Sequence, residues 1–306
     1  MPRGRAGIGF KTSPQRVDWP TLDATWAAAA EVDVLDSAWL NDHLTDLDLE
    51  RPGPSFEALT VAATLVHRVP GKWVGHAVLA NTFRHPAVLA KAATVLDHAT
   101  GGRFILGLGA GWFEGEHEPF GIPLPPIGER IDRLVSAVGV LRALFSEAAA
   151  GPPGVHRPDP FYPLAGATNV PPPLQPGGPP IYLGGQRRRG IELAVRSGDG
   201  WLLPGVNAGD AVYFADRRSA LLRAFEAAGR DPAGFDFVGQ VSVGTSREAR
   251  RTALEQARAL VGAGATSVIL AIPAAAGPAA LVAAAREVGE PLRELLDRAE
   301  SGKMTP

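Results

Sequence analysis

The sequence predicts an α/β protein folded as a (β/α)8 barrel (TIM barrel), and two observations lead to this prediction. Short apolar runs alternate with longer helical patterns along the whole chain, as expected of repeated strand and helix units around a parallel sheet. The apolar runs number eight in a chain of 306 residues, which is enough chain for eight such units in one domain. We therefore expect residues 1–306 to form a single domain, and we favour a barrel over a doubly wound open sheet.

The candidate strands are short apolar stretches bounded by glycine, proline or polar residues. In chain order they cover residues 5–10, 35–41, 72–79, 103–109, 179–185, 199–205, 235–243 and 266–272.

The clearest helical pattern covers residues 129–145, because its apolar residues recur at i, i+3, i+4 and i+7. Those residues are Ile131, Leu134, Val135, Val138, Leu141 and Leu144. Thr245 and Glu248 have the spacing of a capping box and predict that a further helix begins there.

The regular alternation fails between residues 146 and 178, a stretch that contains nine prolines. We expect no helix there and interpret the stretch as a Pro-rich insertion loop before the fifth strand. Loops of this length are usually lids, binding loops or disordered segments. A loop folded over the barrel mouth and a floppy surface insertion are both open alternatives.

Composition narrows the classes of partner. The net charge of −2 gives no overall basic field, so we expect no nucleic-acid partner. No apolar run approaches the roughly 18 residues of a membrane span, so we expect a soluble, cytoplasmic protein with no membrane partner. Cysteine is absent and the seven histidines form no H-x-H or H-E-x-x-H pattern, so we expect no metal site. A small-molecule substrate is the default partner.

The stretch RFILGLGAGW, residues 103–112, ends a predicted strand in three glycines and a tryptophan. It does not fit the dinucleotide-binding fingerprint, because the third glycine comes one residue early and no helix follows at once. In a barrel, active sites lie at the C-terminal ends of the strands. Gly107, Gly109 and Gly111 would leave room there for a flat ligand against the backbone. Trp112 would wall that space and stack on a ring system, or else only pack the loop.

Three segments carry a family resemblance: DSAWLNDHL at 36–44, the stretch from FRHPAVL to GERIDRL at 83–134, and PPIYLGGQRRRGIELAVRSGDGWLL at 179–203. Together they resemble the luciferase-like monooxygenase superfamily, in particular its branch of oxidoreductases that depend on coenzyme F420, an 8-hydroxy-5-deazaflavin. The resemblance implies a bacterial-luciferase-like TIM barrel with a flavin or deazaflavin across its C-terminal mouth. It also implies hydride transfer between that cofactor and a small organic substrate.

The resemblance places Asn41, Asp42 and His43 on the cofactor side of the second strand. His43 is then an acid/base group or substrate contact, and Asp42 helps to position the cofactor. The residues themselves support this only in part. An amide, a carboxylate and a titratable imidazole at one rim suit proton transfer, but Asp42 and His43 are also ordinary turn and cap residues.

Other cofactor contacts follow from the same resemblance. The family carries a non-prolyl cis peptide in a bulge under the cofactor's central ring, which falls here on Ala77 and Val78. Asn81 and Thr82 are candidate polar contacts, whereas we expect Arg84 to hold loop structure. Further seating residues are Gly107, Gly109, Ala110 and Gly111.

Phosphate recognition is expected at Gly184, Gly185 and Gln186, where a strand breaks into glycine and the next helix offers free backbone N–H groups. Arg187, Arg188 and Arg189 follow and oppose the helix dipole, so a bound anion would relieve a cost. A solvated surface run is the alternative. The phosphate and anionic tail of F420, or the phosphate of FMN, would suit this position.

Several nearby charged residues receive no catalytic role. Glu129, Arg130 and Arg133 have the i, i+3 and i, i+4 spacing of helix ion pairs, and we interpret them as structural. The titratable residues of the loop after the fourth strand, Glu114, Glu116 and His117, stay unassigned.

One departure from the family pattern concerns the substrate. In the similar deazaflavin-dependent sugar-phosphate dehydrogenases, a catalytic glutamate stands where this chain has Trp112. That substrate class is therefore doubtful here, and we assign Trp112 to the wall of the substrate site. His43 is our candidate for proton transfer.

Two other functions stay open at this point. The chain could be an FMN-dependent two-component monooxygenase supplied by a separate flavin reductase, or a barrel that binds a flavin without turnover. A homodimer is a further expectation from the family.

Overall fold

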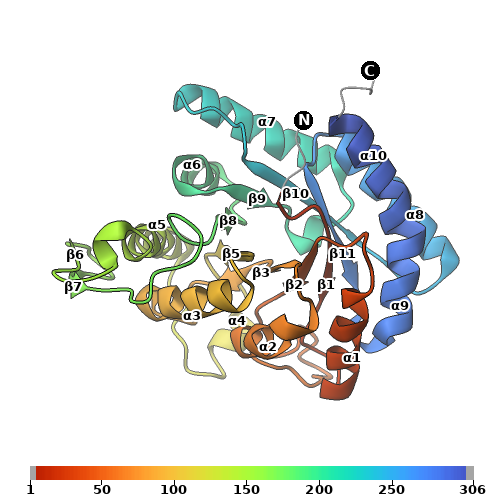
Figure 1. Cartoon of the computed structure of the whole chain (residues 1–306), viewed down its shortest axis with the longest axis horizontal. Helices are drawn as coiled ribbons and strands as arrows, with labels where there is room; N and C mark the ends of the chain where they lie inside the picture. The colour runs from red at the N-terminus through yellow and green to blue at the C-terminus, as the bar shows by residue number, and fades with distance from the viewer. Residues whose placement is uncertain (1–4, 301–306) are drawn as a thin grey trace.

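Eight parallel strands close into a barrel in the computed structural model, which describes residues 5–300 (Figure 1). The ends of the predicted domain, 1–4 and 301–306, lie outside the described residues. Around the barrel the strands are β1 (Ile8–Thr12), β2 (Ser37–Leu40), β3 (Trp73–His76), β5 (Phe104–Gly109), β8 (Ile181–Leu183), β9 (Gly200–Leu202), β10 (Asp236–Ser242) and β11 (Ser267–Ile272). Pairing of β1 with β11 and of β3 with β5 closes the ring. A two-residue strand, β4 (Leu79–Ala80), pairs with the end of β5.

All eight predicted strands are present, and the predicted (β/α)8 barrel is confirmed. Some boundaries were wrong, since the strands predicted to end at residues 79 and 205 end at His76 and Leu202. The first strand was predicted over 5–10 but runs from Ile8 to Thr12. Its pairing with β2 and β11 continues past the last apolar residue, Phe10, through Lys11.

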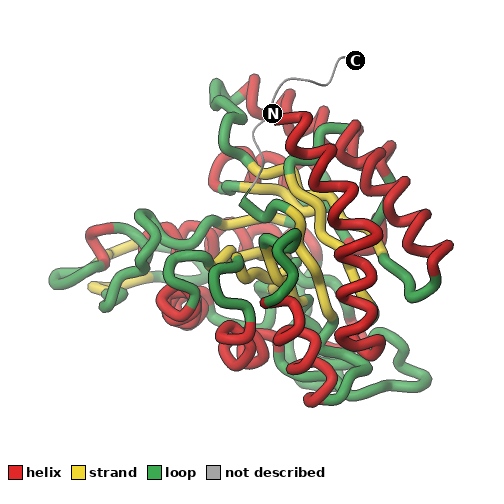
Figure 2. The backbone as a smooth tube through the Cα atoms, turned by 45° about the vertical axis from the view of Figure 1, so that its right-hand side comes forward, coloured by secondary structure: helices red, strands yellow, loops and turns green. Residues whose placement is uncertain are grey.

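Helices surround the strands, as the turned view in Figure 2 also shows. The α-helices are α1 (Trp19–Ala30), α2 (Ala58–Leu65), α3 (Pro86–Ala99), α4 (Glu114–His117), α5 (Ile127–Leu144), α6 (Arg188–Ser197), α7 (Ala211–Ala227), α8 (Arg247–Gly262), α9 (Gly277–Ala284) and α10 (Glu290–Glu300). Single 3-10 turns are η1 (Val66–Arg68), η2 (Glu147–Ala149), η3 (Gly205–Asn207) and η4 (Ala274–Ala276), and η5 (Ala285–Gly289) is a π-helical turn between α9 and α10. None of the described helices has the length and apolarity needed to cross a membrane.

The helix predicted over 129–145 is α5, which begins two residues earlier, at Ile127. The predicted capping box was wrong by one residue. Ser246, not Thr245, is the N-cap of α8, because its hydroxyl accepts the backbone N–H of Ala249 at 3.1 Å. Glu248 therefore lies inside the first turn, where a carboxylate favours the positive end of the helix dipole.

The Pro-rich segment 146–178 contains no α-helix, only the single 3-10 turn η2. It also forms an antiparallel hairpin of β6 (Val155–Arg157) and β7 (Leu164–Ala167), which extends outward beyond α5 in Figure 1. The rest of the segment runs along α3: buried Asn169 donates to Thr94, and Gln175 donates to Asp97 and to the Phe104 carbonyl at the start of β5. The segment thus packs against α3, α5 and the N-terminal end of β5, away from the C-terminal mouth. It is neither a lid over the mouth nor a floppy insertion.

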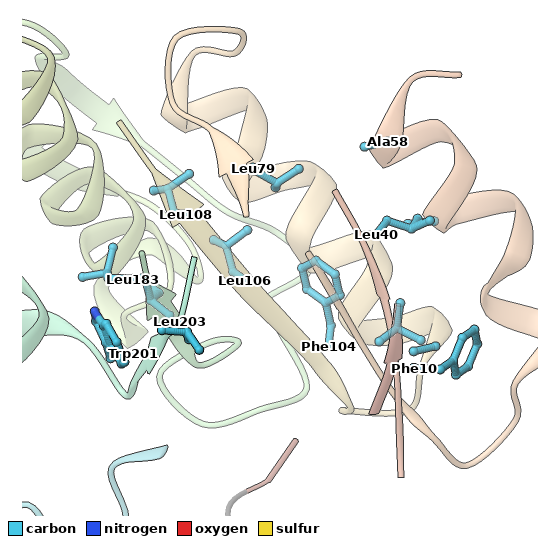
Figure 3. Packing of buried hydrophobic residues seen from close by; sticks show 14 of the residues in the cluster. Phe10, Leu40, Ala58, Leu79, Phe104, Leu106, Leu108, Leu183, Trp201 and Leu203 are labelled. Atoms are coloured by element: carbon cyan, nitrogen blue, oxygen red, sulfur yellow. The ribbon is translucent and has the colours of Figure 1, made fainter. Parts of the chain in front are cut away.

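Alternate residues of each strand face two different cores, as in other barrels. The outward-facing residues pack against the helices, and Figure 3 shows part of this shell, with Phe104, Leu106 and Leu108 of β5 between Phe10 and Leu183. The inward-facing residues fill the barrel itself, and they are Ala6, Trp39, Ile105, Tyr182, Leu202, Val238 and Ile269.

The two largest side chains inside the barrel fit only because neighbouring strands carry glycine. Trp39 and Tyr182 stack with ring centroids 6.3 Å apart. A Cβ atom at Gly75 would lie 2.6 Å from the Trp39 ring, and one at Gly200 would lie 2.8 Å from the Tyr182 ring. These rings block the barrel interior.

The N-terminal end of the barrel is closed below the rings by a buried carboxylate. Asp236 accepts hydrogen bonds from the Tyr182 hydroxyl at 2.8 Å, from the Ala6 backbone at 3.1 Å and from the hydroxyls of Thr266 and Ser267. Burial, together with Asp236, raises the pKa of Tyr182 well above its ordinary value. The Tyr182 phenol therefore stays a neutral donor that seals this end.

Candidate active site

A histidine and a buried carboxylate meet at the C-terminal mouth of the barrel. His43 follows β2, and Glu116 lies on the short helix α4 in the loop after β5. The His43 Nδ1 atom lies 3.0 and 3.2 Å from the two Glu116 carboxylate oxygens. The Leu44 backbone N–H donates to the same carboxylate at 2.9 Å, and Glu116 is only 1% exposed.

This pairing fixes the state of the histidine ring. An ionised carboxylate only accepts hydrogen bonds, so Nδ1 must carry the proton that it donates to Glu116. In the neutral imidazole, Nε2 then keeps its lone pair and can accept a proton. His43 therefore has the geometry of an oriented acid/base group. Glu116, which the sequence left unassigned, is the residue that orients it.

Aromatic side chains wall the His43 ring. Trp112 meets it edge to face with centroids 5.9 Å apart, and Phe113 does so at 6.2 Å. Trp112 and Phe113 also contact each other. Trp112 remains 59% exposed, so one side of its ring packs against the loop while the rest faces the solvent at the rim. Trp112 therefore packs in part against the loop, and its role as the wall of a substrate site stays a prediction.

The Asp42 carboxylate forms its hydrogen bonds within the protein. Its carboxylate binds Arg84 through both oxygens, at 2.6 and 2.9 Å, and also accepts the Ala80 N–H at 2.9 Å. Arg84 in turn pairs with Glu57, the N-cap of α2. Arg84 therefore holds loop structure, as expected. Asp42 joins the loops after β2 and β3, and any effect of Asp42 on a cofactor passes through those loops.

The Ala77–Val78 peptide bond is cis, and the glycines of β5 make room for the bulge that contains it. A Cβ atom at Gly107 would lie 1.7 Å from the His76 carbonyl oxygen, and one at Gly109 would lie 2.7 Å from the Val78 side chain. We expected these glycines to leave open space for a ligand. That explanation was wrong, because the chain itself fills the space.

The next two residues have related roles. A Cβ atom at Gly111 would lie 2.5 Å from the Thr82 hydroxyl, and the φ angle of Gly111 is +77°, a conformation that favours glycine. Ala110 packs against the outer core. The stripped end of β5 therefore positions the β3 bulge and the loop after β4.

Two amide oxygens at the mouth lack a protein partner. Asn41 Oδ1 and Asn81 Oδ1 are buried and make no hydrogen bond among the described residues. The Asn41 side-chain N–H donates to Gln15 at 2.7 Å, and the Asn81 backbone N–H donates to the Gly109 carbonyl at 2.9 Å. Buried polar atoms are normally paired, so these two oxygens fit a ligand that brings hydrogen-bond donors.

The N-terminus of α6 has the features of an anion site. Its N-cap, Arg187, makes no side-chain cap, and no acidic residue lies in the first turn. Gly185 approaches the helix so closely that a Cβ there would lie 2.6 Å from the Gly190 Cα. The oxygen of the Gln186 side chain accepts the Tyr213 hydroxyl. A phosphate needs N–H donors, and the side-chain N–H2 group of Gln186 and the backbone N–H groups at the start of α6 can both supply them.

Two of the three arginines that follow form ion pairs within the protein. Arg189 pairs with Asp132 on α5, and Arg188 lies 3.4 Å from Glu192 on its own helix. Arg187 is exposed. The expected cluster of three cations is thus partly neutralised by neighbouring carboxylates.

The other titratable residues of the loop after β5 and of α5 either bond within the protein or are exposed. His117 is buried, donates from Nδ1 to the Phe113 carbonyl at 2.7 Å and accepts from the Thr82 hydroxyl at 2.8 Å. Arg133 pairs with Glu129, and Arg130 donates to the Gly111 carbonyl. Glu114 is exposed.

No other part of the described chain competes with the mouth. Within residues 5–300, no group of three or more His, Cys, Asp or Glu side chains is arranged to hold a metal ion. Surface hollows at the opposite end of the barrel, beside Lys72 and beside Arg142, contain no histidine–carboxylate pair. They also lie away from the strand C-termini, where barrel enzymes place their chemistry.

The closed eight-stranded barrel and the oriented histidine at its C-terminal mouth define a TIM-barrel protein with a candidate site at that mouth. The chain belongs to the luciferase-like monooxygenase family, whose model matches residues 20–305. The resemblance seen in the sequence is thereby confirmed.

Two relatives indicate the branch. The chain is 32% identical over 231 residues to an F420-dependent glucose-6-phosphate dehydrogenase of Kineococcus radiotolerans. It is 31% identical over 232 residues to a phthiodiolone/phenolphthiodiolone dimycocerosates ketoreductase of Mycobacterium tuberculosis. These alignments cover 75% and 70% of this chain, but only 65% and 58% of the relatives' own lengths.

Solved structures share the fold. An F420-dependent secondary alcohol dehydrogenase, in complex with an F420–acetone adduct, superposes with a TM-score of 0.76 at 17% identity, covering 94% of this chain and 98% of that one. A long-chain alkane monooxygenase superposes with a TM-score of 0.66 at 18% identity, covering 86% and 73%. At these identities the likeness concerns the fold alone.

Proposed function

We propose that the chain is an oxidoreductase that transfers a hydride between coenzyme F420 and a small organic substrate. The observation that carries the proposal is the His43–Glu116 pair at the barrel mouth, beside Trp112. The names of the relatives, a dehydrogenase that depends on F420 and a ketoreductase, support the same class of reaction.

Three features of the mouth fit a deazaflavin. The Ala77–Val78 bulge would lie against the ring, and the unpaired oxygens of Asn41 and Asn81 would accept its N–H or hydroxyl groups. The backbone of Gly184 and Gly185 and the uncapped start of α6 would hold the phosphate. When bound, the cofactor supplies or accepts the hydride. The protein supplies orientation and exclusion of water.

His43 provides the proton chemistry. Glu116 keeps Nδ1 protonated, so Nε2 can take the proton of a substrate hydroxyl during oxidation or return it to the oxygen during reduction. Trp112 and Phe113 shield that exchange from solvent. We further propose that residues 1–306 form a single domain and that the protein is a cytoplasmic homodimer.

The test is a fluorescence titration of the cofactor-free protein with oxidised F420 and, in parallel, with FMN, using the tryptophans as reporters. The proposal predicts a dissociation constant in the micromolar range or tighter for F420 and clearly weaker binding of FMN. A preference for FMN would assign the chain to the monooxygenases that take reduced flavin from a reductase. Binding of neither would overturn the cofactor assignment.

The phosphate seat makes a sharper prediction. Arg187→Asp should stabilise the cofactor-free protein by about 1 kcal/mol, because aspartate caps the free N–H groups of α6. The same carboxylate should weaken F420 binding roughly tenfold, or about 1.4 kcal/mol, because it competes with the phosphate. Arg196→Asp is the matched control: it is exposed and makes the same charge change in the last turn of α6. That control should leave F420 affinity unchanged, and equal affinity in Arg187→Asp would exclude α6 as the seat.

A further inference from the structure

Lys11 is a cationic side chain on the inner surface of the barrel. It lies on β1 in register with Trp39 on β2 and Ala271 on β11, near the C-terminal ends of all three strands. Gly9, two residues earlier, faces the Trp39 ring, so alternation along the strand turns Lys11 inward as well. The lysine thus belongs to the wall of the same mouth as His43.

The Lys11 amine has one fixed hydrogen-bond partner. Its Nζ lies 2.6 Å from Oε1 of Gln240, which is on β10, two strands away. The Gln240 amide is itself held, because its N–H donates to the Leu203 carbonyl, and the residue is 3% exposed. Gly205 lines the other side, where an added Cβ would still lie 4.0 Å from Nζ. The amine is therefore positioned by a buried amide, and a glycine leaves space beside it.

No negative charge within residues 5–300 balances this amine. Among residues 5–300, no carboxylate forms an ion pair with Lys11, and burial lowers the pKa of its ammonium group to about 8. A protonated lysine has three N–H donors, and Gln240 uses one of them. A partly buried cation without a counter-charge is costly. An anionic ligand group would remove that cost, whereas a neutral one would not.

We propose that Lys11 and Gln240 form a subsite for an anionic oxygen group of the substrate, namely a carboxylate. The inference rests on the proposed function, because it assigns a substrate class to the same mouth. The substrate then carries a carboxylate that binds Lys11 and an apolar portion that meets Trp112 and Phe113. Lys11 is a specificity residue in this assignment, and the proton transfer remains with His43.

The test compares hexanoate with hexanamide, which has the same chain length but no charge, by isothermal titration calorimetry. It uses the full chain both without cofactor and loaded with F420. Hexanoate should bind the unmodified protein at least about tenfold more tightly than hexanamide. Lys11→Met should abolish that preference, and Lys11→Arg should keep most of it. Lys91→Met, at an exposed lysine on α3, is the matched control and should change nothing.

A second variant guards against misfolding of Lys11→Met. Gln240→Glu places a carboxylate against the amine from within the chain, so it should also remove the preference for hexanoate while keeping the positive charge. Equal binding of the two probes to the unmodified protein would overturn the proposal. So would a full preference in both variants. If Lys11→Met instead weakens F420 binding while the preference for hexanoate persists, the amine serves the cofactor and the substrate assignment is wrong. Failure of F420 to bind the unmodified protein would reject the proposed function alone, because the cofactor-free titrations still decide the subsite.

Discussion

At the scale of single residues, His43 and His76 show how differently the barrel treats two imidazoles. His43 lies at the rim and is oriented by Glu116. His76 ends β3 and is fully buried. Its Nε2 lies 3.3 Å from the Ala58 carbonyl oxygen, its ring packs edge to face against Phe104, and its Nδ1 has no hydrogen-bond partner among the described residues. The first histidine is oriented at the mouth by a carboxylate, whereas burial keeps the second neutral.

The buried histidine should make stability depend on pH. Burial lowers the pKa of His76 from 6.5 to about 4, although the nearby Asp42 carboxylate acts in the opposite direction. Between those values the unfolded chain binds a proton that the folded chain does not, so stability falls as the pH falls from 6.5 to 4. The full loss is about 3 kcal/mol. Urea unfolding across this range should show the slope in the natural protein, and His76→Leu should flatten it. An unchanged slope in that variant would assign the effect to other groups.

The His43–Glu116 pair predicts a change of tautomer. In Glu116→Gln, the amide oxygen should accept the Leu44 N–H, and the amide N–H2 should then face His43 Nδ1. The ring should move its proton from Nδ1 to Nε2, which removes the proton acceptor from the mouth. Nitrogen-15 NMR of labelled histidines at alkaline pH distinguishes the two tautomers. F420 affinity should be unchanged, and retention of the Nδ1–H form would contradict the assigned role of Glu116.

The sequence could predict His43 but not its partner. His43 closes an apolar strand, so its place at the mouth follows from the barrel itself. Glu116 is 73 residues away and reaches His43 only because a single helical turn, α4, forms in a loop that is rich in glycine and proline. The sequence interpretation expected no helix directly after residues 103–112, so it could not predict where the Glu116 side chain points. Asp42 illustrates the same limit, since its bonds to Arg84 depend on how two loops meet.

At the scale of elements, the glycines of β5 leave space for the end of the neighbouring strand β3 and for the bulge that follows it. The His76 carbonyl occupies the space beside Gly107, and the Val78 side chain occupies the space beside Gly109. Because β5 has no side chains at these two positions, the bulge after β3 can pack against it. The eight strands were predictable because buried parallel strands are continuous apolar runs. The end of β1 was not, because Lys11 interrupts the apolar run while the backbone pairing continues.

A pair of alanine substitutions tests this use of glycine. Gly107→Ala should destabilise the protein by about 3 kcal/mol, because its Cβ would lie 1.7 Å from a backbone oxygen. Gly128→Ala, in the first turn of α5 with no atom within 4 Å of the added Cβ, should stabilise it by about 0.5–1 kcal/mol. Chemical denaturation measures both. A tolerated Gly107→Ala would show that the β3 bulge can move away from β5.

At the scale of the whole molecule, the candidate site and the Pro-rich segment lie in different parts of the barrel. The mouth carries His43, the unpaired asparagine oxygens and the start of α6. The Pro-rich segment 146–178 instead packs against α3 and α5. Its proline content indicated an irregular segment, but only the hydrogen bonds of the folded chain placed it against α3 and the N-terminal end of β5.

The segment should therefore matter for stability and not for binding. Gln175→Ala removes hydrogen bonds of 2.7 Å to buried Asp97 and 2.9 Å to the Phe104 carbonyl, which should cost about 2 kcal/mol. Leu174→Ala, at a neighbouring side chain that is 53% exposed, should stay within about 0.5 kcal/mol of the natural protein. Thermal unfolding measures the difference. F420 titration of Gln175→Ala should match the natural protein, and weaker binding would connect the segment to the mouth.

The stacked rings of Trp39 and Tyr182, together with the Asp236 hydrogen bonds, close the barrel interior, so the C-terminal mouth is the end of the barrel that is open to ligands. Anything bound at the mouth arrives and departs through the same opening, because the other end is sealed by packed rings and a saturated carboxylate. Two ligands that share such an opening cannot exchange independently. On the proposed function, a cofactor that lies deeper in the mouth than the substrate enters first and leaves last, so steady-state kinetics should follow an ordered sequence.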